Sequence, residues 1–139
     1  MAQYPDDFTK AVDDLIDNWE GGYVDDPKDP GGETKYGISR AQYPKLDIKD
    51  LTRDQAIDIY YRDYWLRYKL DEKISDPAIR AKCFNMGVLM GPLTALAIAL
   101  SSKEIDDYRD RCKRHFELIV QNHPEEEKFL KGWLRRAAA

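Results

Sequence analysis

The chain has 139 residues, which is the length of one domain and enough to bury a hydrophobic core without disulfide bonds. Hydrophobic residues make up 42% of it and aromatic residues 12%, as in a folded globular protein. A formal net charge of −4 argues against a nucleic-acid-binding protein, and any attraction to an anionic surface has to be local. Cys83 and Cys112 are too few for a disulfide framework, so we expect two buried thiols.

The sequence has no pattern typical of a targeting or membrane segment. The first ten residues lack a basic stretch followed by an apolar one, so no signal peptide is predicted. The longest apolar run, residues 84–100, is broken by Gly87, Gly91 and Pro92. It therefore predicts two core helices rather than a membrane span.

The first predicted helix covers residues 8–19, where apolar side chains recur at spacings of three and four. Glu20 lies four residues after Ile16, so its side chain is expected to leave from the apolar face. Gly21 and Gly22 follow and would end the helix. An apolar neighbourhood and the negative end of the helix dipole both favour the neutral carboxyl, which is the form that a general acid uses. The alternative is an ordinary glutamate that reaches past the core into water.

A loop rich in glycine and acidic residues follows this helix and reads EGGYVDDPKDPGGETKYGIS over residues 20–39. Eight residues separate Glu20 from Asp29, and four separate Asp29 from Thr34. This order resembles the acid, the water-positioning carboxylate and the hydroxyl of phage-type lysozymes, in which the spacing to the threonine is one residue longer. The full string resembles more specifically the signature of the glycosyl hydrolase family 108 muramidases, a set of phage and bacterial peptidoglycan hydrolases. The resemblance implies that Glu20, which precedes Gly-Gly-Tyr, is the catalytic acid.

Two segments after the loop offer candidate substrate ligands on predicted helices. Thr52 and Gln55 form a capping box for a helix to about residue 68, which carries a broad aromatic stripe. Tyr64 and Trp65 are the candidates for stacking on pyranose rings, although the stripe is equally typical of a core. Asn85 lies near the end of a helix opened by Asp76 and Pro77; it resembles an asparagine that contacts the sugar acetamido group in lysozyme-like folds. Its alternative role is that of a polar residue that ends a helix.

The rest of the chain predicts further helices and a shortened middle. Ser101 or Ser102 is expected to cap a long helix, and Pro124 to separate it from the last one, whose sequence again resembles the family. Family members usually have a longer stretch between Phe-Asn-x-Gly-Val and Gly-Pro-x-Thr segments, in a peptidoglycan-binding subdomain, and here the two segments are nearly fused. We predict a catalytic region over residues 1–86 and a helical remnant of that subdomain over residues 87–139, packed as one domain. The expected fold class is mainly α and lysozyme-like, with a small loop or hairpin after the first helix.

The resemblance implies an N-acetylmuramidase of the endolysin type, which cleaves the β-1,4 bond between N-acetylmuramic acid and N-acetylglucosamine. Glu20 would protonate the leaving oxygen. Asp29, or failing it Asp26, would position water or stabilise the cationic transition state, with Thr34 helping to orient the water. The sequence leaves open retaining, inverting and lytic transglycosylase chemistry, and the last would make Asp29 dispensable.

The expected partner is a peptidoglycan glycan strand, with no nucleic acid and no membrane segment involved, and we expect a monomer. No cofactor is implied, and no metal site is expected because His115 and His123 lack partners at ligand spacing. The protein would be made in the cytoplasm and act in the periplasm or cell wall after release by a holin, a secretion system or lysis. Two alternatives remain: a non-catalytic peptidoglycan-binding or secretion-accessory protein that keeps the fold, and a regulatory protein that reuses the scaffold.

Overall fold

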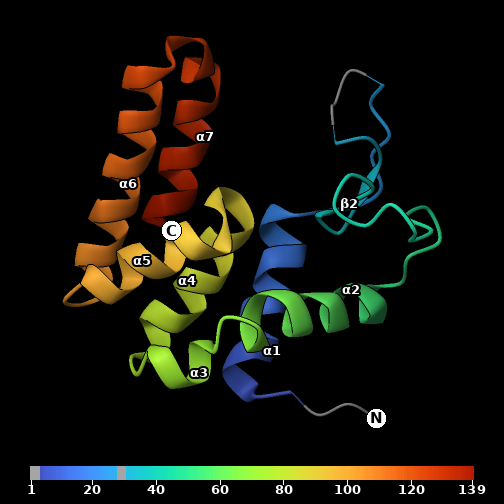
Figure 1. Cartoon of the computed structure of the whole chain (residues 1–139), viewed down its shortest axis with the longest axis horizontal. Helices are drawn as coiled ribbons and strands as arrows, with labels where there is room; N and C mark the ends of the chain where they lie inside the picture. Colours follow the sequence, from blue (N-terminus) through green and yellow to red (C-terminus); the bar gives the residue numbers. More distant parts are fainter. Residues whose placement is uncertain (1–3, 28–30) are drawn as a thin grey trace. The chain divides into compact units, whose positions relative to one another are not determined.

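The structure, a computed structural model, describes residues 4–27 and 31–139. It consists of two compact units, Met1–Arg67 and Tyr68–Ala139 (Figure 1). Helices make up most of the second unit and most of the regular structure of the first, in which the described strands form one small hairpin. The predicted mainly α fold with a hairpin after the first helix is therefore confirmed. Within the described ranges, no helix has both the length and the apolarity that crossing a membrane requires.

The first unit begins with α1 (Asp6–Asp14), which runs directly into a π-helical turn, η1 (Leu15–Trp19). The predicted apolar face is present, and Phe8 and Val12 are fully buried. At the end of η1 the backbone N–H of Glu20 donates to the carbonyl of Leu15 at 2.7 Å, five residues back instead of four. The helix thus reaches Glu20 with a locally widened turn.

A two-stranded antiparallel hairpin follows the glycine-rich loop and pairs β1 (Thr34–Lys35) with β2 (Ile38–Ser39). Its turn is made by Tyr36 and Gly37, which have φ angles of +53° and +81°. Val24 adds an isolated bridge to Thr34, in which the two residues exchange backbone hydrogen bonds of 2.8 and 2.7 Å. This bridge ties the start of the loop to the hairpin.

The second helix of the first unit, α2 (Arg53–Tyr60), is followed by another π-helical segment, η2 (Tyr61–Leu66). The predicted capping box is confirmed: Gln55 N–H donates to the Thr52 hydroxyl at 3.1 Å, and Thr52 N–H donates to the Gln55 side chain at 2.9 Å. Aromatic rings of α1 and η2 pack together, with Phe8 4.9 Å from Tyr61 and 5.3 Å from Trp65 between ring centroids. Phe8 and Trp65 are fully buried, so this cluster is part of the core of the unit.

The second unit is entirely helical. Its elements are α3 (Leu70–Lys73), α4 (Pro77–Met90), α5 (Pro92–Ser101), α6 (Ile105–Asn122), the 3₁₀ turn η3 (Pro124–Glu126) and α7 (Glu127–Ala138). Helix α4 packs against α5, and α6 runs antiparallel to α7 (Figure 1). Asp76 caps α4 through the N–H of Ala78 at 2.9 Å, as predicted, but α4 continues beyond the expected end near residue 86. The predicted functional division at residues 86 and 87 therefore lies inside a helix and stays a prediction.

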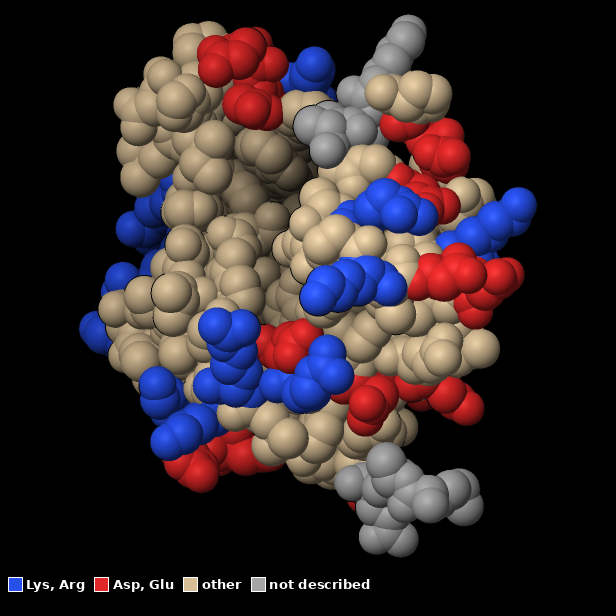
Figure 2. All heavy atoms as spheres, turned by 45° about the vertical axis from the view of Figure 1, so that its right-hand side comes forward, with Lys and Arg blue, Asp and Glu red and all other residues tan. Residues whose placement is uncertain are grey.

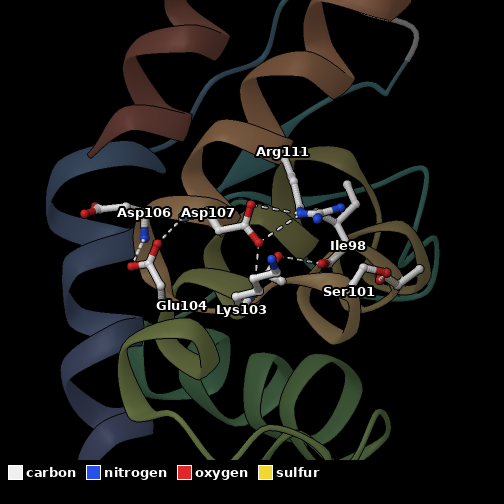
Figure 3. Close-up of polar contacts among 9 residues, drawn as sticks. Ile98, Ser101, Lys103, Glu104, Asp106, Asp107 and Arg111 are labelled. Atoms are coloured by element: carbon white, nitrogen blue, oxygen red, sulfur yellow. Dashed lines mark hydrogen bonds and ion pairs between the residues drawn. The ribbon is translucent and has the colours of Figure 1, made fainter.

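The predicted serine cap of α6 is wrong. Ser101 and Ser102 bond back to carbonyls of α5, and the residue that caps α6 is Glu104. Its carboxylate accepts the N–H groups of Asp106 and Asp107, both at 2.9 Å (Figure 3). A glutamate can replace the usual short cap residue here because its extended backbone directs the longer side chain back to the first turn.

The chain carries 22 Lys and Arg residues and 26 Asp and Glu residues. On the face drawn in Figure 2, the acidic and basic side chains are interspersed. This distribution agrees with a small net charge and leaves recognition of a ligand to local contacts on that face.

Candidate active site

A pocket of about 330 Å³ in the first unit brings together two of the three predicted catalytic residues, Glu20 and Thr34. The pocket is lined by Glu20, Gly21, Gly22, Val24, Thr34 and Gly37. These residues come from the end of η1, the glycine pair and the hairpin, so the first helix and the loop build the pocket together. The third predicted catalytic residue, Asp29, lies outside the described residues.

Glu20 is the residue directly after η1 and has an extended backbone, with φ −115° and ψ 95°. Its side chain is partly exposed and lies against Gly37. A Cβ atom added at Gly37 would be 2.9 Å from Glu20 Cβ and 3.0 Å from Glu20 Cγ. Position 37 therefore requires glycine for two reasons. A larger residue would collide with the side chain of Glu20, and the hairpin turn has a positive φ there, which glycine adopts without strain.

Thr34 reaches the pocket from β1, where its backbone is hydrogen-bonded to Val24. Val24 also lines the pocket and is 54% exposed, so it adds an apolar surface beside the two polar side chains. Asp26, the second choice for the auxiliary carboxylate, is exposed and is not among the lining residues. Among the described residues, the pocket thus offers one carboxyl group, one hydroxyl group and the backbone of the glycines around them.

A cluster of three side chains that the sequence analysis missed holds the two arms of the loop together. The hydroxyl of Tyr23 donates to Glu33 Oε2 at 2.5 Å, and two guanidinium nitrogens of Arg40 donate to Glu33 Oε1, the Nε at 2.7 Å. The hydrogen bond to Glu33 raises the pKa of Tyr23 to about 12, and the bonds from Tyr23 and Arg40 lower the pKa of Glu33. Both oxygens of the Glu33 carboxylate are therefore engaged in holding the loop.

The pairing of Glu33 with Arg40 has a signal in the sequence. The hairpin register places Thr34 opposite Ser39, so Glu33 and Arg40 are the next pair outward, and Arg40 N–H donates to the Glu33 carbonyl at 3.0 Å. Opposite charges across antiparallel strands stabilise a hairpin. The contact between Glu33 and Arg40 could therefore have been predicted from the sequence once the hairpin register was predicted.

The three predicted substrate ligands are not among the residues that line this pocket. Trp65 is fully buried, and Tyr64 is partly buried with its ring 5.3 Å from that of Tyr60. Asn85, in the second unit, is 7% exposed and accepts a hydrogen bond from Arg136 Nε at 2.8 Å. Substrate roles for these side chains stay predictions, and in this structure each of them makes intramolecular packing or hydrogen-bond contacts.

The described parts of the chain contain no arrangement of side chains suited to bind a metal ion or to act as a reactive thiol. No group of three or more His, Cys, Asp or Glu side chains is arranged there to hold a metal ion. Cys83 and Cys112 are buried free thiols, as predicted. Burial raises the pKa of Cys83 to about 12 and that of Cys112 to about 11, so neither is suited to act as a nucleophile near neutral pH.

Comparisons with known proteins agree with the fold. Residues 14–91 match the family model described as glycosyl hydrolase 108, and they include every residue that lines the pocket. A solved structure from Brucella abortus, that of SagA, is similar, with a TM-score of 0.72 and 27% sequence identity over 94% of this chain and 89% of that chain. No curated protein sequence matches the chain. With a mainly α, lysozyme-like fold and a family model that matches more than half of its length, the chain belongs to glycosyl hydrolase family 108, a family of peptidoglycan hydrolases.

Proposed function

We propose that this protein is an N-acetylmuramidase that hydrolyses the β-1,4 bond between N-acetylmuramic acid and N-acetylglucosamine, with Glu20 as the general acid. The observation that carries the proposal is the shared pocket of Glu20 and Thr34, in which the glutamate lies against Gly37. Hydrolysis of a glycoside requires a carboxylic acid beside the leaving oxygen and a means of placing water on the sugar. The family membership supports the same class of reaction.

In the proposed reaction, Glu20 gives its proton to the leaving oxygen as the bond to the anomeric carbon breaks and an oxocarbenium-like transition state develops. Water then adds to the anomeric carbon and loses a proton to a second carboxylate. Glu33 is a poor candidate for that carboxylate because both of its oxygens are engaged by Tyr23 and Arg40. Asp29 is our first choice and Asp26 the second, with Thr34 orienting the water.

We further propose the setting of this activity. The partner is a peptidoglycan glycan strand, bound by a monomer through local contacts, since the chain has a net charge of −4. The protein would work as an endolysin, released to the periplasm or cell wall by a holin, a secretion system or lysis. No cofactor enters the proposed reaction.

The test is digestion of purified peptidoglycan by the wild type, Glu20→Gln, Asp29→Asn and Asp26→Asn, with mass spectrometry of the products after borohydride reduction. Glu117→Gln, an exposed glutamate on α6, is the matched control. We expect reduced muramic acid ends from the wild type and the control, and a loss of about 10²-fold to 10⁴-fold in Glu20→Gln.

Three outcomes would change the proposal. Products with 1,6-anhydro ends, unaffected by Asp29→Asn, would indicate a lytic transglycosylase. Full activity in Glu20→Gln would overturn the role of Glu20. Binding of peptidoglycan by folded wild-type protein without release of products would identify a binding module instead of an enzyme.

A further inference from the structure

Three residues from separate segments of the first unit meet at the wall of the pocket: Glu20 after η1, Gly37 in the hairpin turn and Tyr60 at the end of α2. A Cβ atom added at Gly37 would be 2.9 Å from Glu20 Cβ and closer still to the Tyr60 hydroxyl. The side chain of Glu20 and the hydroxyl of Tyr60 therefore both lie against the bare backbone of Gly37. Glu20 lines the pocket, and Tyr60 is fully buried.

The Tyr60 hydroxyl has a specific hydrogen-bond partner at this point. It donates to the carbonyl oxygen of Tyr36 at 2.8 Å. Tyr36 is a non-glycine residue at φ +53°, a conformation that costs free energy and persists where surrounding contacts enforce it. The hydrogen bond from Tyr60 is one of the contacts that enforce it.

The peptide group on the other side of Tyr36 is held by the residue that follows Glu20. The N–H of Tyr36 donates to the carbonyl oxygen of Gly21 at 2.8 Å. Tyr36 is thus fixed on one side to the backbone beside the proposed acid and on the other side to a buried phenol of α2. Gly37, which follows, is held in place as the surface on which the methylene groups of Glu20 rest.

We infer that Tyr60 and Gly37 are positioning residues for Glu20: through the Tyr36 carbonyl, Tyr60 fixes the glycine surface that sets the direction of the Glu20 carboxyl group. This inference rests on the proposed role of Glu20 as the acid. Proton transfer in a glycosidase depends on a carboxyl group held in one direction, and misplacement by about 1 Å can cost about 10²-fold in rate. Tyr60 is buried and is not among the residues that line the pocket, so we assign it a positioning role and not a catalytic one.

The first variant is Tyr60→Phe, which keeps the ring that packs against Tyr64 at 5.3 Å and removes only the hydroxyl. Its matched control is Tyr43→Phe, which removes another phenol hydroxyl of the first unit, one that donates to Asp63 at 2.6 Å. We expect kcat on peptidoglycan to fall by about 10-fold to 100-fold in Tyr60→Phe with KM within about twofold. Tyr43→Phe should keep kcat within about twofold at a similar change in melting temperature.

A second measurement needs no turnover. The side-chain carbons of Glu20 are followed by NMR in protein labelled with ¹³C-glutamate, with the signal assigned from the Glu20→Gln spectrum. We expect averaging of the Glu20 side-chain rotamers in Tyr60→Phe and in Gly37→Ala, and the wild-type rotamer in Tyr43→Phe. The NMR measurement still tests the inference if the wild type releases no product. In that case the proposed function fails, and the positioning of Glu20 is judged from its side-chain rotamer alone.

The inference is overturned if Tyr60→Phe keeps the wild-type kcat, or if its Glu20 rotamers match those of the wild type. A loss of activity in Tyr60→Phe that follows the melting temperature, with an equal loss in Tyr43→Phe, would also overturn it, because both hydroxyls would then serve stability alone.

Discussion

The loop around Glu20 and the helix pair α6 and α7 are stabilised by different kinds of contact. The loop is held by polar contacts: the cluster of Tyr23, Glu33 and Arg40, the backbone bridge of Val24 to Thr34, and the turn fixed by Tyr60. The helix pair is held by apolar packing, in which the rings of Phe116 and Trp133 stack with centroids 5.2 Å apart.

The two kinds of contact predict different effects of substitutions on stability and on reaction rate. Apolar packing is roughly proportional to the area removed from water and is tolerant of small shifts, so its loss lowers the free energy of unfolding. Polar contacts around a loop are directional and add little net free energy each, so their loss changes geometry more than stability. Substitutions in the second unit should therefore change stability, and substitutions around the loop should change rates.

The strongest test of this contrast is Phe116→Ala in α6. Phe116 is 2% exposed and stacks on Trp133, so truncation removes a buried ring and leaves a cavity. We expect a loss of about 3–5 kcal/mol in the free energy of unfolding, measured by urea denaturation. Leu118→Ala on the same helix is the control: Leu118 is 56% exposed, and its truncation should change the free energy by less than about 0.5 kcal/mol. Equal losses in the two variants would remove the basis for assigning stability to packing in this unit.

A smaller and equal effect is expected from the two helix caps, one in each unit. Thr52→Ala removes the hydroxyl that accepts from Gln55 N–H, and Asp76→Ala removes the carboxylate that accepts from Ala78 N–H. Each should lower the free energy of unfolding by about 1 kcal/mol because one N-terminal donor of the helix loses its acceptor. The measurement is again urea denaturation. A loss in the free energy of unfolding that is several times larger for one cap than for the other would show that the two units also differ at their helix ends.

The ion pairs of Arg53 should contribute less. Arg53 bonds to Asp13 at 2.9 Å and to Asp17 at 2.8 Å, but all three side chains are at least 37% exposed. We expect Arg53→Ala to cost between about 0.2 and 1 kcal/mol at low salt, and less at 1 M salt because exposed charges are screened. Thermal unfolding at the two salt concentrations checks this, and a loss that does not depend on salt would mean that Arg53 acts through packing.

The most local effect is expected at Tyr23. Its pKa is raised to about 12, chiefly by the hydrogen bond to Glu33, so the stabilisation by this bond is complete below the ordinary value near 10 and is lost as the pH rises through about 12. The pKa of Glu33 is lowered, so its share is present above the ordinary carboxyl value and is lost only as the pH falls through the lowered one. In Glu33→Gln, an NMR titration of ¹³C-labelled tyrosine should show the Tyr23 midpoint moving back toward about 10. An unchanged midpoint would mean that Glu33 does not set it.

Much of the helical structure follows from local sequence signals. The capping box at Thr52, the cap at Asp76 and the apolar face that includes Phe8 are all present as predicted. The π-helical turns were not predicted, because an extra residue per turn leaves the same apolar side chains buried and changes little in the spacing pattern. The cap at Glu104 was missed because two serines offered the more usual choice, and α3 because four residues carry no periodicity.

The site was predicted in part for a similar reason. Glu20 and Thr34 are close in the sequence and are brought together by a short hairpin, so one motif that carries the family resemblance contains both. The contact of Gly37 with Tyr60 joins residues from two elements, and no local pattern encodes it. The aromatic stripe pointed to Trp65 as a sugar platform, but a stripe does not say which of its faces is buried.

The π-helical turn before Glu20 has a consequence for how this segment tolerates change. A π-helical turn is in effect an α-helix with one residue inserted, and each residue of an α-helix turns the chain by about 100°. The widened turn takes up the additional residue, since the N–H of Glu20 bonds to the carbonyl of Leu15 five residues back. A regular α-helix through Leu15–Trp19 with the same number of residues would rotate the side chain of Glu20 by about 100°, away from Gly37. The direction of the acid therefore depends on the widened turn itself: substitutions that make Leu15–Trp19 regularly α-helical would turn Glu20 away from Gly37, whereas removal of one residue together with the widened turn would leave its direction nearly unchanged.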